Sequence, residues 1–208
     1  MYVTAILPQK ACFTIYREKT TYRVAADGGA NLLVKRKCMP DAVIGDFDSL
    51  KSKTREKMPN TKFLYIPEQD TNDADKAVSH CLKLGFKEIH LLSADGGRQD
   101  QFLSGLEILF KYSKKARLIS WTQMERMEFI YQNWEEKIQP GTTLSMLPVF
   151  GLAQGIVTKG LKYPLKNQSL IPGKPPSGVS NLVVSNPVKI NVTKGRLLLV
   201  IQHKEFFN

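Results

Sequence analysis

Aspartate is the residue type whose placement says most about chemistry in this chain. All nine aspartates lie between Asp27 and Asp100 in a sequence of 208 residues, and none follows. Because aspartate is a poor residue for the interiors of strands and helices, this clustering predicts turns, helix caps or a polar site built from several loop ends. Carboxylates gathered in this way are typical ligands of a hard cation such as Mg²⁺.

Four short motifs carry most of these aspartates. Each follows a strand-like segment and precedes a helix-like one, which is where open α/β sheets bind their ligands. The glycines in two of the motifs allow the backbone to approach a ligand closely, and a helix start offers unpaired N–H groups to an anion. The motifs are ADGGAN at 26–31, GDFDS at 45–49, QDTND at 69–73 and GGRQDQ at 96–101.

The GDFDS motif places Asp46 and Asp48 two residues apart. If the chain stays extended there, both carboxylates face the same side and can share a hard cation. Without a cation, two carboxylates that close would raise one pKa, so Mg²⁺ resolves the conflict. Ser49 is expected to cap the helix that begins near Lys51.

The motifs QDTND and GGRQDQ bring further acidic and basic groups to helix starts. One of Asp70 and Asp73 is expected to cap the helix, which leaves the other free for metal, water or substrate. Lys76, one turn on, is interpreted as a solvated partner of Asp73, with contact to phosphate as the alternative. Arg98 offers a planar fork suited to phosphate, and Asp100 returns a carboxylate to the same edge. Together the four motifs predict a polyphosphate and Mg²⁺ site.

The elements that must position these groups alternate between strands and helices through the first half of the chain. This pattern is typical of parallel βαβ units. Gly85 is expected to end one of the helices. The predicted strands are 3–7, 22–26, 42–44, 62–66, 89–92 and 116–121, and the predicted helices are 30–37, 51–57, 72–84 and 99–112.

After about Met124 the sequence pattern changes to short apolar stretches separated by Gly, Pro and Asn. Such a pattern favours an antiparallel sandwich, with strands at 144–148, 155–157, 182–184, 188–192 and 196–202. Four prolines predict a long loop from Pro164 to Ser177. The fold class is therefore α/β: a three-layer, Rossmann-like parallel-sheet domain at 1–125, followed by a smaller antiparallel β-sandwich domain at 126–208.

Composition narrows the class of protein. Hydrophobic residues make up 42% and charged residues 24% of the chain, as in ordinary globular proteins. No apolar run approaches a membrane span, and three cysteines without a Cys-x-x-Cys pair exclude a disulfide scaffold, so we expect a cytoplasmic protein with no membrane partner. The net charge of +11 raises the alternative of a nucleic-acid-binding protein. The basic residues of the chain are dispersed, and aromatic residues do not alternate with them, which argues against a nucleic-acid partner.

The four motifs, in this order and spacing, resemble the thiamine pyrophosphokinase family. GDFDS within PDAVIGDFDSL is the most specific match, and GLKYPL at 160–165 and VSN at 179–181 resemble the family's C-terminal signature. The resemblance implies transfer of pyrophosphate from ATP to the hydroxyl of thiamine, giving thiamine diphosphate and AMP, with Mg²⁺. A Mg²⁺-dependent phosphohydrolase that uses the same carboxylates is the alternative enzyme.

The resemblance also implies roles for individual residues. Asp46, Asp48 and Asp73 would hold Mg²⁺, with help from Asp27, and Arg98 would contact phosphate. Asp73 and Asp100 remain the two candidates for accepting the hydroxyl proton. Further contacts with ATP would come from Gly28, Asn31, Ser49, Gln69, Asp70, Gly97 and Gln101.

The C-terminal signature would contact the other substrate. Ser180 and Asn181 would lie near the pyrimidine of thiamine, and the resemblance implies a homodimer in which the sandwich completes the neighbour's site. Gln69 and Gln101 stand where bacterial members often have Lys and His, which suggests a variant of the site similar to the eukaryotic branch.

Overall fold

The computed structural model describes residues 2–4, 22–92, 98–122 and 124–202. The chain divides into two compact units, Met1–Gln123 and Met124–Asn208. The glycine pair of the fourth motif, which includes the predicted ATP contact Gly97, falls at 96–97 and lies outside the described residues. Among the helices of the described ranges, none is long and apolar enough to cross a membrane.

The first unit is built on a parallel sheet with the strand order β6-β5-β1-β2-β3-β4. The central strands β2 and β3 are mostly buried apolar runs, as expected where helices cover both faces of a sheet. The return of β5 to a place beside β1 creates a point where the direction of winding reverses. The strands are β1 (Tyr2–Thr4), β2 (Arg23–Ala26), β3 (Ala42–Gly45), β4 (Lys62–Tyr65), β5 (Glu88–Leu92) and β6 (Arg117–Trp121).

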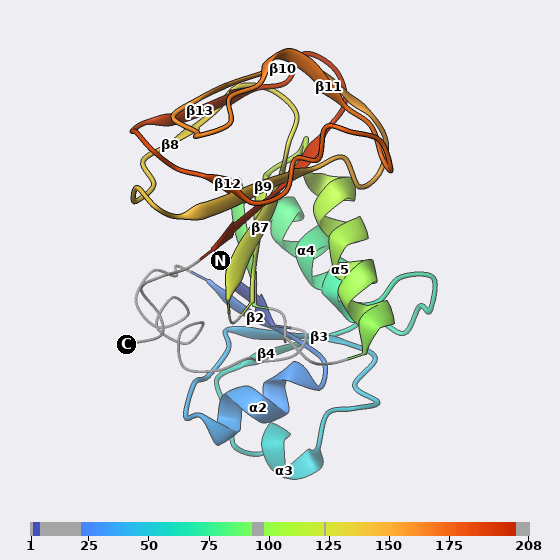
Figure 1. Ribbon diagram of the computed structural model, residues 1–208. Coiled ribbons are helices and arrows are strands. Elements are labelled where there is room, and N and C mark those ends of the chain that lie inside the picture. The colour runs from blue at the N-terminus through green and yellow to red at the C-terminus, as the bar shows by residue number, and fades with distance from the viewer. Residues whose placement is uncertain (1, 5–21, 93–97, 123, 203–208) are drawn as a thin grey trace. The chain divides into compact units, whose positions relative to one another are not determined.

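Four described helices complete this unit as outer layers. In Figure 1, α2 and α3 lie on one side of the sheet, and α4 and α5 lie on the other. The helices are α2 (Gly29–Lys35), α3 (Ser52–Arg55), α4 (Asp73–Lys83) and α5 (Gln99–Tyr112). The predicted three-layer α/β fold is thus confirmed, and α5 has the predicted bounds.

The ends of α4 show how local sequence sets an element that carries site residues. Asn72 caps the helix, since its side chain accepts a hydrogen bond from the backbone N–H of Asp75. Gly85 ends it at a φ of 87°, and Phe86 N–H donates to the carbonyl of Cys81 at 3.2 Å, as in a Schellman motif. The predicted cap by Asp70 or Asp73 was therefore wrong, because the amide of Asn72 occupies that role.

The second unit consists of two antiparallel sheets around an apolar core. One sheet has the order β12-β9-β14-β7, and the other has β11-β10-β13-β8. Alternate residues such as Leu144, Met146, Val188 and Ile190 point into the core and are at most 1% exposed. The strands are β7 (Glu125–Ile130), β8 (Trp134–Glu136), β9 (Thr143–Leu147), β10 (Ala153–Lys159), β11 (Lys166–Leu170), β12 (Asn181–Leu182), β13 (Val188–Asn191) and β14 (Leu197–Gln202).

This unit confirms the predicted sandwich and corrects some of its details. The segment 164–177 was predicted to be a loop throughout, but Lys166–Leu170 forms β11 and pairs with β10. The prolines flank this strand at Pro164 and Pro172, so its five residues keep every backbone donor. The strands β7 and β8 were not predicted, and β7 falls at the predicted domain boundary.

Candidate functional site

A single cavity of about 480 Å³ in the first unit is lined by residues of all four motifs. The fourth motif contributes Gln101. Because β2 and β3 are parallel neighbours, their carboxyl ends bring Asp27 and Asp46 to the same edge of the sheet. The N-terminal turn of α4 adds Asp73. Predicted residues in the lining are Asp27, Gly28, Asp46, Asp48, Ser49, Gln69, Asp73 and Gln101.

Asp27 is the most buried acid of this cavity, at 3% exposure. Its Oδ2 accepts a hydrogen bond from Ser49 N–H at 3.0 Å, whereas its buried Oδ1 has no hydrogen-bond partner among the described residues. Burial raises the pKa of Asp27, and the nearby charges of Asp73 and Asp48 add to this rise. A buried carboxylate oxygen without a donor is costly, and a bound cation would satisfy it.

Asp46 and Asp48 both reach the cavity, but not along an extended chain. Phe47 between them has a φ of 65°, and Asp48 N–H donates to Asp46 Oδ1 at 3.2 Å. The condition of an extended chain was therefore wrong, although the two carboxylates still line one pocket. The Gln69 amide donates to Asp46 Oδ2 at 2.7 Å, and this hydrogen bond is the main reason why the pKa of Asp46 lies below its usual value.

Asp73 forms an ion pair with a lysine of its own helix. Lys76 Nζ lies 3.2 Å from Asp73 Oδ1 and donates to the carbonyl of Ile66 at 3.1 Å. Lys76 is only 6% exposed, so the expectation of a solvated pair was wrong, because the turn of α4 points its side chain inward. Burial raises the pKa of Asp73, and the ammonium group of Lys76 opposes that rise. Lys76 also lines the cavity.

The loop 46–50 is held from the side of α2. The Asn31 amide donates to the carbonyl of Ser49 at 2.8 Å and accepts from Lys51 N–H at 3.1 Å. Ser49 does not cap α3: its hydroxyl donates to Asp48 Oδ1, and the N-cap residue is Lys51. A Cβ at Gly28 would lie 3.0 Å from that of Ser49, so this glycine permits the close approach.

At the start of α5, Arg98 and Asp100 pair with one another. The guanidinium Nε donates to Asp100 Oδ1 at 3.1 Å, and Nη2 donates to Oδ2, so the fork binds both carboxylate oxygens. This ion pair lowers the pKa of Asp100. Both side chains are exposed and neither lines the cavity, whereas Gln101 does. Asp70 is also exposed and lies outside the lining.

Three carboxylates have the geometry of a cation site. Asp27, Asp46 and Asp48 each offer an oxygen, and these atoms lie within 4.8 Å of one another. Oxygen ligands and room for substrate oxygens are what Mg²⁺ requires, so the donor set fits this ion. Asp73 is near this group, since a Cβ at Gly45 would lie 2.8 Å from Asp27 Cβ and 3.1 Å from Asp73 Oδ1.

Sequence reasoning left Thr71 and Lys76 out of the proposed site, although both line the cavity. Lys76 was considered, but its burial depends on how α4 packs and is not visible in the spacing. Thr71 lies between two predicted residues, and that adjacency was the available signal.

The two residues predicted to contact thiamine lie in the second unit. Ser180 is exposed, with a φ of 58° and its N–H bonded to Ser145 Oγ at 3.0 Å. Asn181 is 6% exposed. Its amide accepts from Tyr163 N–H at 3.0 Å and donates to the Tyr163 carbonyl at 2.7 Å. Asn181 therefore connects the two segments of the C-terminal signature through the backbone of Tyr163.

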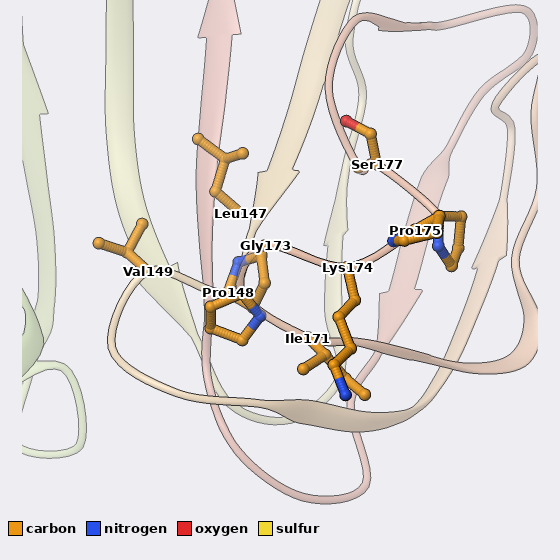
Figure 2. A pocket seen from close by; sticks show the side chains of 11 residues that line it. Leu147, Pro148, Val149, Ile171, Gly173, Lys174, Pro175 and Ser177 are labelled. Atoms are coloured by element: carbon orange, nitrogen blue, oxygen red, sulfur yellow. The ribbon is translucent and has the colours of Figure 1, made fainter.

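Two other cavities differ from the acidic one in the charge of their linings. In the second unit, about 500 Å³ lies between Leu147–Val149 and the chain from Ile171 to Gly178 (Figure 2), and the charged residue in that lining is Lys174. In the first unit, a cavity of about 420 Å³ is bordered by Lys76, Asp75 and Tyr112. Asp75 accepts from Tyr112 Oη at 2.5 Å and from Lys111 Nζ at 2.6 Å, so its charge is compensated.

The chain thus has the architecture of a two-domain protein: a parallel α/β unit with an acidic cavity at the carboxyl edge of its sheet, suited to Mg²⁺ and phosphate groups, is followed by a β-sandwich. Two family models match the chain: "Thiamin pyrophosphokinase, catalytic domain" over residues 13–120 and "Thiamin pyrophosphokinase, vitamin B1 binding domain" over 133–197. The chain belongs to the thiamin pyrophosphokinase family. It is an enzyme of the kind that transfers pyrophosphate from ATP to thiamine, and the phosphohydrolase alternative is not favoured.

Individual relatives agree with this assignment. The thiamine pyrophosphokinase of Bacillus subtilis (strain 168) is 28% identical over 193 residues, which cover 90% of both chains. Thiamin pyrophosphokinase 1 of Caenorhabditis elegans is 28% identical over 170 residues, covering 75% of this chain and 69% of the relative.

Solved structures show the same fold. The crystal structure of thiamine pyrophosphokinase from Bacillus subtilis superposes with a TM-score of 0.86 at 23% identity and covers 98% of both chains. Thiamin pyrophosphokinase from Candida albicans gives a TM-score of 0.80 at 19% identity, covering 97% of this chain and 88% of the other.

Proposed function

We propose that the acidic cavity of the first unit binds Mg²⁺ and the phosphates of ATP, and that Asp27, Asp46 and Asp48 hold the metal ion. The observation that carries this proposal is the buried Oδ1 of Asp27, which no described residue partners, within a group of three carboxylates whose oxygens lie within 4.8 Å. When bound, Mg²⁺ neutralises phosphate charge and orients the triphosphate. This arrangement keeps Asp46 and Asp48 as metal ligands and exchanges the roles of Asp27 and Asp73.

Asp73 then becomes the better of the two candidates for accepting the proton of the thiamine hydroxyl. It lines the cavity, and its Oδ1 is the oxygen that pairs with Lys76. Asp100 lies outside the lining, and Arg98 occupies both of its oxygens. A general base must lie within hydrogen-bond reach of the proton that it removes. We assign Arg98 to the phosphates, because its guanidinium fork can exchange the Asp100 carboxylate for a pair of phosphate oxygens.

The second unit is the part of the chain that we propose to bind thiamine and to take part in a dimer. Residues 133–197 match a family model described as a vitamin B1 binding domain, and this range includes Ser180 and Asn181. We propose that Ser180 contacts thiamine directly, whereas Asn181 holds the loop of Tyr163, since its amide already bonds to that backbone. The acidic cavity lies in the first unit, so thiamine bound by the second unit must be brought to an acidic site. We propose a cytoplasmic homodimer in which the partner subunit supplies that site.

An AMP-release assay with purified protein tests the reaction. We expect AMP to appear only when ATP, Mg²⁺ and thiamine are all present, with thiamine diphosphate as the second product. AMP formed at the same rate without thiamine would instead show a phosphohydrolase. EDTA should abolish the activity, and added Mg²⁺ should restore it.

Subunit complementation tests the shared site. The Asp46→Asn variant and a Ser180→Ala, Asn181→Ala variant should each be inactive, and their mixture should regain activity after subunit exchange. If labelled subunits exchange and no activity returns, both substrates bind within one chain.

A further inference from the structure

Phe47, the residue between two of the acidic ligands, has an unusual backbone conformation. Its φ of 65° lies in the left-handed region that bulky side chains rarely adopt. Backbone strain of this kind persists only where the surroundings determine it, and it gathers at functional sites. Neither the hydrogen bonds of Asp48 nor the cavity lining involves the Phe47 ring.

The ring of Phe47 packs instead on a cluster that we call the aromatic clamp: Phe47, Arg55, Phe63 and Tyr65. Phe63 meets Phe47 edge to face at 5.9 Å and 84°, and Tyr65 lies 5.8 Å away. The Arg55 guanidinium carbon is 4.6 Å from the centroid of Phe63 and 5.7 Å from that of Phe47. Such aromatic and cation–π contacts are attractive and depend on geometry.

The residues of the clamp other than Phe47 come from a strand and a helix that other contacts hold in place. Phe63 and Tyr65 belong to β4, which pairs in parallel with β3, the strand that leads into the acidic loop. Arg55 comes from α3, which follows this loop. The loop is thus held from its entry, its exit and the neighbouring strand. Its peptide direction at Phe47 decides where the carboxylates of Asp46 and Asp48 point.

We propose that Phe47 is a positioning residue: the aromatic clamp maintains the left-handed turn that directs Asp46 and Asp48 into one cation site. This inference rests on the proposed function, because it requires those two carboxylates to bind Mg²⁺. None of the residues of the clamp lines the acidic cavity. Loss of the aromatic clamp should therefore weaken cation binding more than it changes any other property of the site.

The test measures Mn²⁺ binding, by the EPR signal of free Mn²⁺, to the full chain without nucleotide. Phe47→Leu keeps an apolar side chain, for which a left-handed φ is as unfavourable as for Phe, but it removes the ring that holds the turn, and it should raise the Mn²⁺ dissociation constant by about 10- to 100-fold. Phe63→Leu removes the partner ring from a position outside the loop and should act in the same direction. Phe47→Tyr retains the ring and should keep wild-type affinity. The Mg²⁺ concentration that half-saturates AMP release should shift in parallel.

Phe86→Leu is the matched control. Phe86 stacks on Tyr22 at 5.7 Å and 13° in the same unit, and it does not line the acidic cavity. This variant should melt at a lower temperature with unchanged Mn²⁺ affinity. If Phe86→Leu weakens binding as much as Phe47→Leu does, or if Phe47→Leu and Phe63→Leu bind Mn²⁺ like wild type, the positioning role is overturned. Absence of Mn²⁺ binding in wild type would overturn the cation assignment itself, and with it the role of Phe47.

Discussion

Replacement of Asp27 by Asn removes a charge from the most buried acidic position of the cavity. The carbonyl of the introduced asparagine can still accept the hydrogen bond from Ser49 N–H, and its NH₂ group would replace Oδ1, which no described residue partners. The new NH₂ group needs a partner as much as Oδ1 does, so the gain comes from removal of the charge: an ionised carboxylate buried beside Asp73 and Asp48 costs at least as much as an unsatisfied neutral acceptor, about 1–3 kcal/mol. We therefore expect Asp27→Asn to stabilise the metal-free protein by about 1–2 kcal/mol, which corresponds to a rise of about 2–8 °C in Tm.

The pH dependence follows from the direction of the pKa shift. The pKa of folded Asp27 is raised above its ordinary value of 3.8, mainly by burial. As pH rises through 3.8, the unfolded state ionises first, so this group lowers the stability of the wild type until the folded pKa is passed. The advantage of Asp27→Asn should therefore be smaller at about pH 4.5 than at about pH 7.5, where the full cost of the ionised carboxylate is present.

Thermal melting in EDTA and in Mg²⁺ provides the assay. Mg²⁺ should raise the Tm of wild type, since a ligand that binds only the native state stabilises it, and it should raise the Tm of Asp27→Asn much less. Asp75→Asn is the matched control: this second buried aspartate is bonded to Tyr112 and Lys111, so its replacement should lower Tm. A lower Tm for Asp27→Asn in EDTA would refute the reasoning, because the carboxylate would then stabilise the empty site.

Four further substitutions test other parts of the structure. Asp46→Asn and Asp48→Asn should each reduce AMP release by about 100-fold or more, with nearly unchanged circular dichroism; near-normal rates in both would remove them from the metal site. Arg98→Lys keeps the charge but loses the planar fork, so steady-state kinetics should show a loss of about 10- to 1,000-fold in kcat/KM; unchanged kinetics would leave Arg98 only its pairing with Asp100. Tyr112→Phe removes a donor to Asp75 and should lower the free energy of unfolding by about 1–3 kcal/mol in urea titrations at unchanged kcat, whereas unaltered stability would show that Lys111 or water compensates.

The sequence was sufficient to predict which strand ends would meet. Polar residues after successive parallel strands must lie on one edge, so Asp27, Asp46 and Asp73 could be grouped without knowledge of side-chain positions. The bounds of α5 also followed from sequence, since a long helical period with flanking loop residues leaves few alternatives.

The remaining details depend on side-chain competition that spacing does not express. Asn72 took the helix cap although two aspartates stood nearby, because its backbone φ of −78° and ψ of 164° suit the cap position. β11 formed between prolines because pairing with β10 outweighed the local composition. The left-handed turn at Phe47 could not be predicted, since its cause lies in the rings of Phe63 and Tyr65.

Lys76 and Thr71 border both the acidic cavity and the cavity beside Asp75, so the buried side chain of Lys76 forms part of the wall between the two spaces. In a transferase, water competes with the acceptor hydroxyl for the same phosphoanhydride, and exclusion of water decides between transfer and waste of ATP. We expect a shortened side chain at this position to remove part of that wall and to admit water closer to Asp73. Under the proposed function, the residue that balances the charge of Asp73 would thereby also help to keep water from the transferred phosphate.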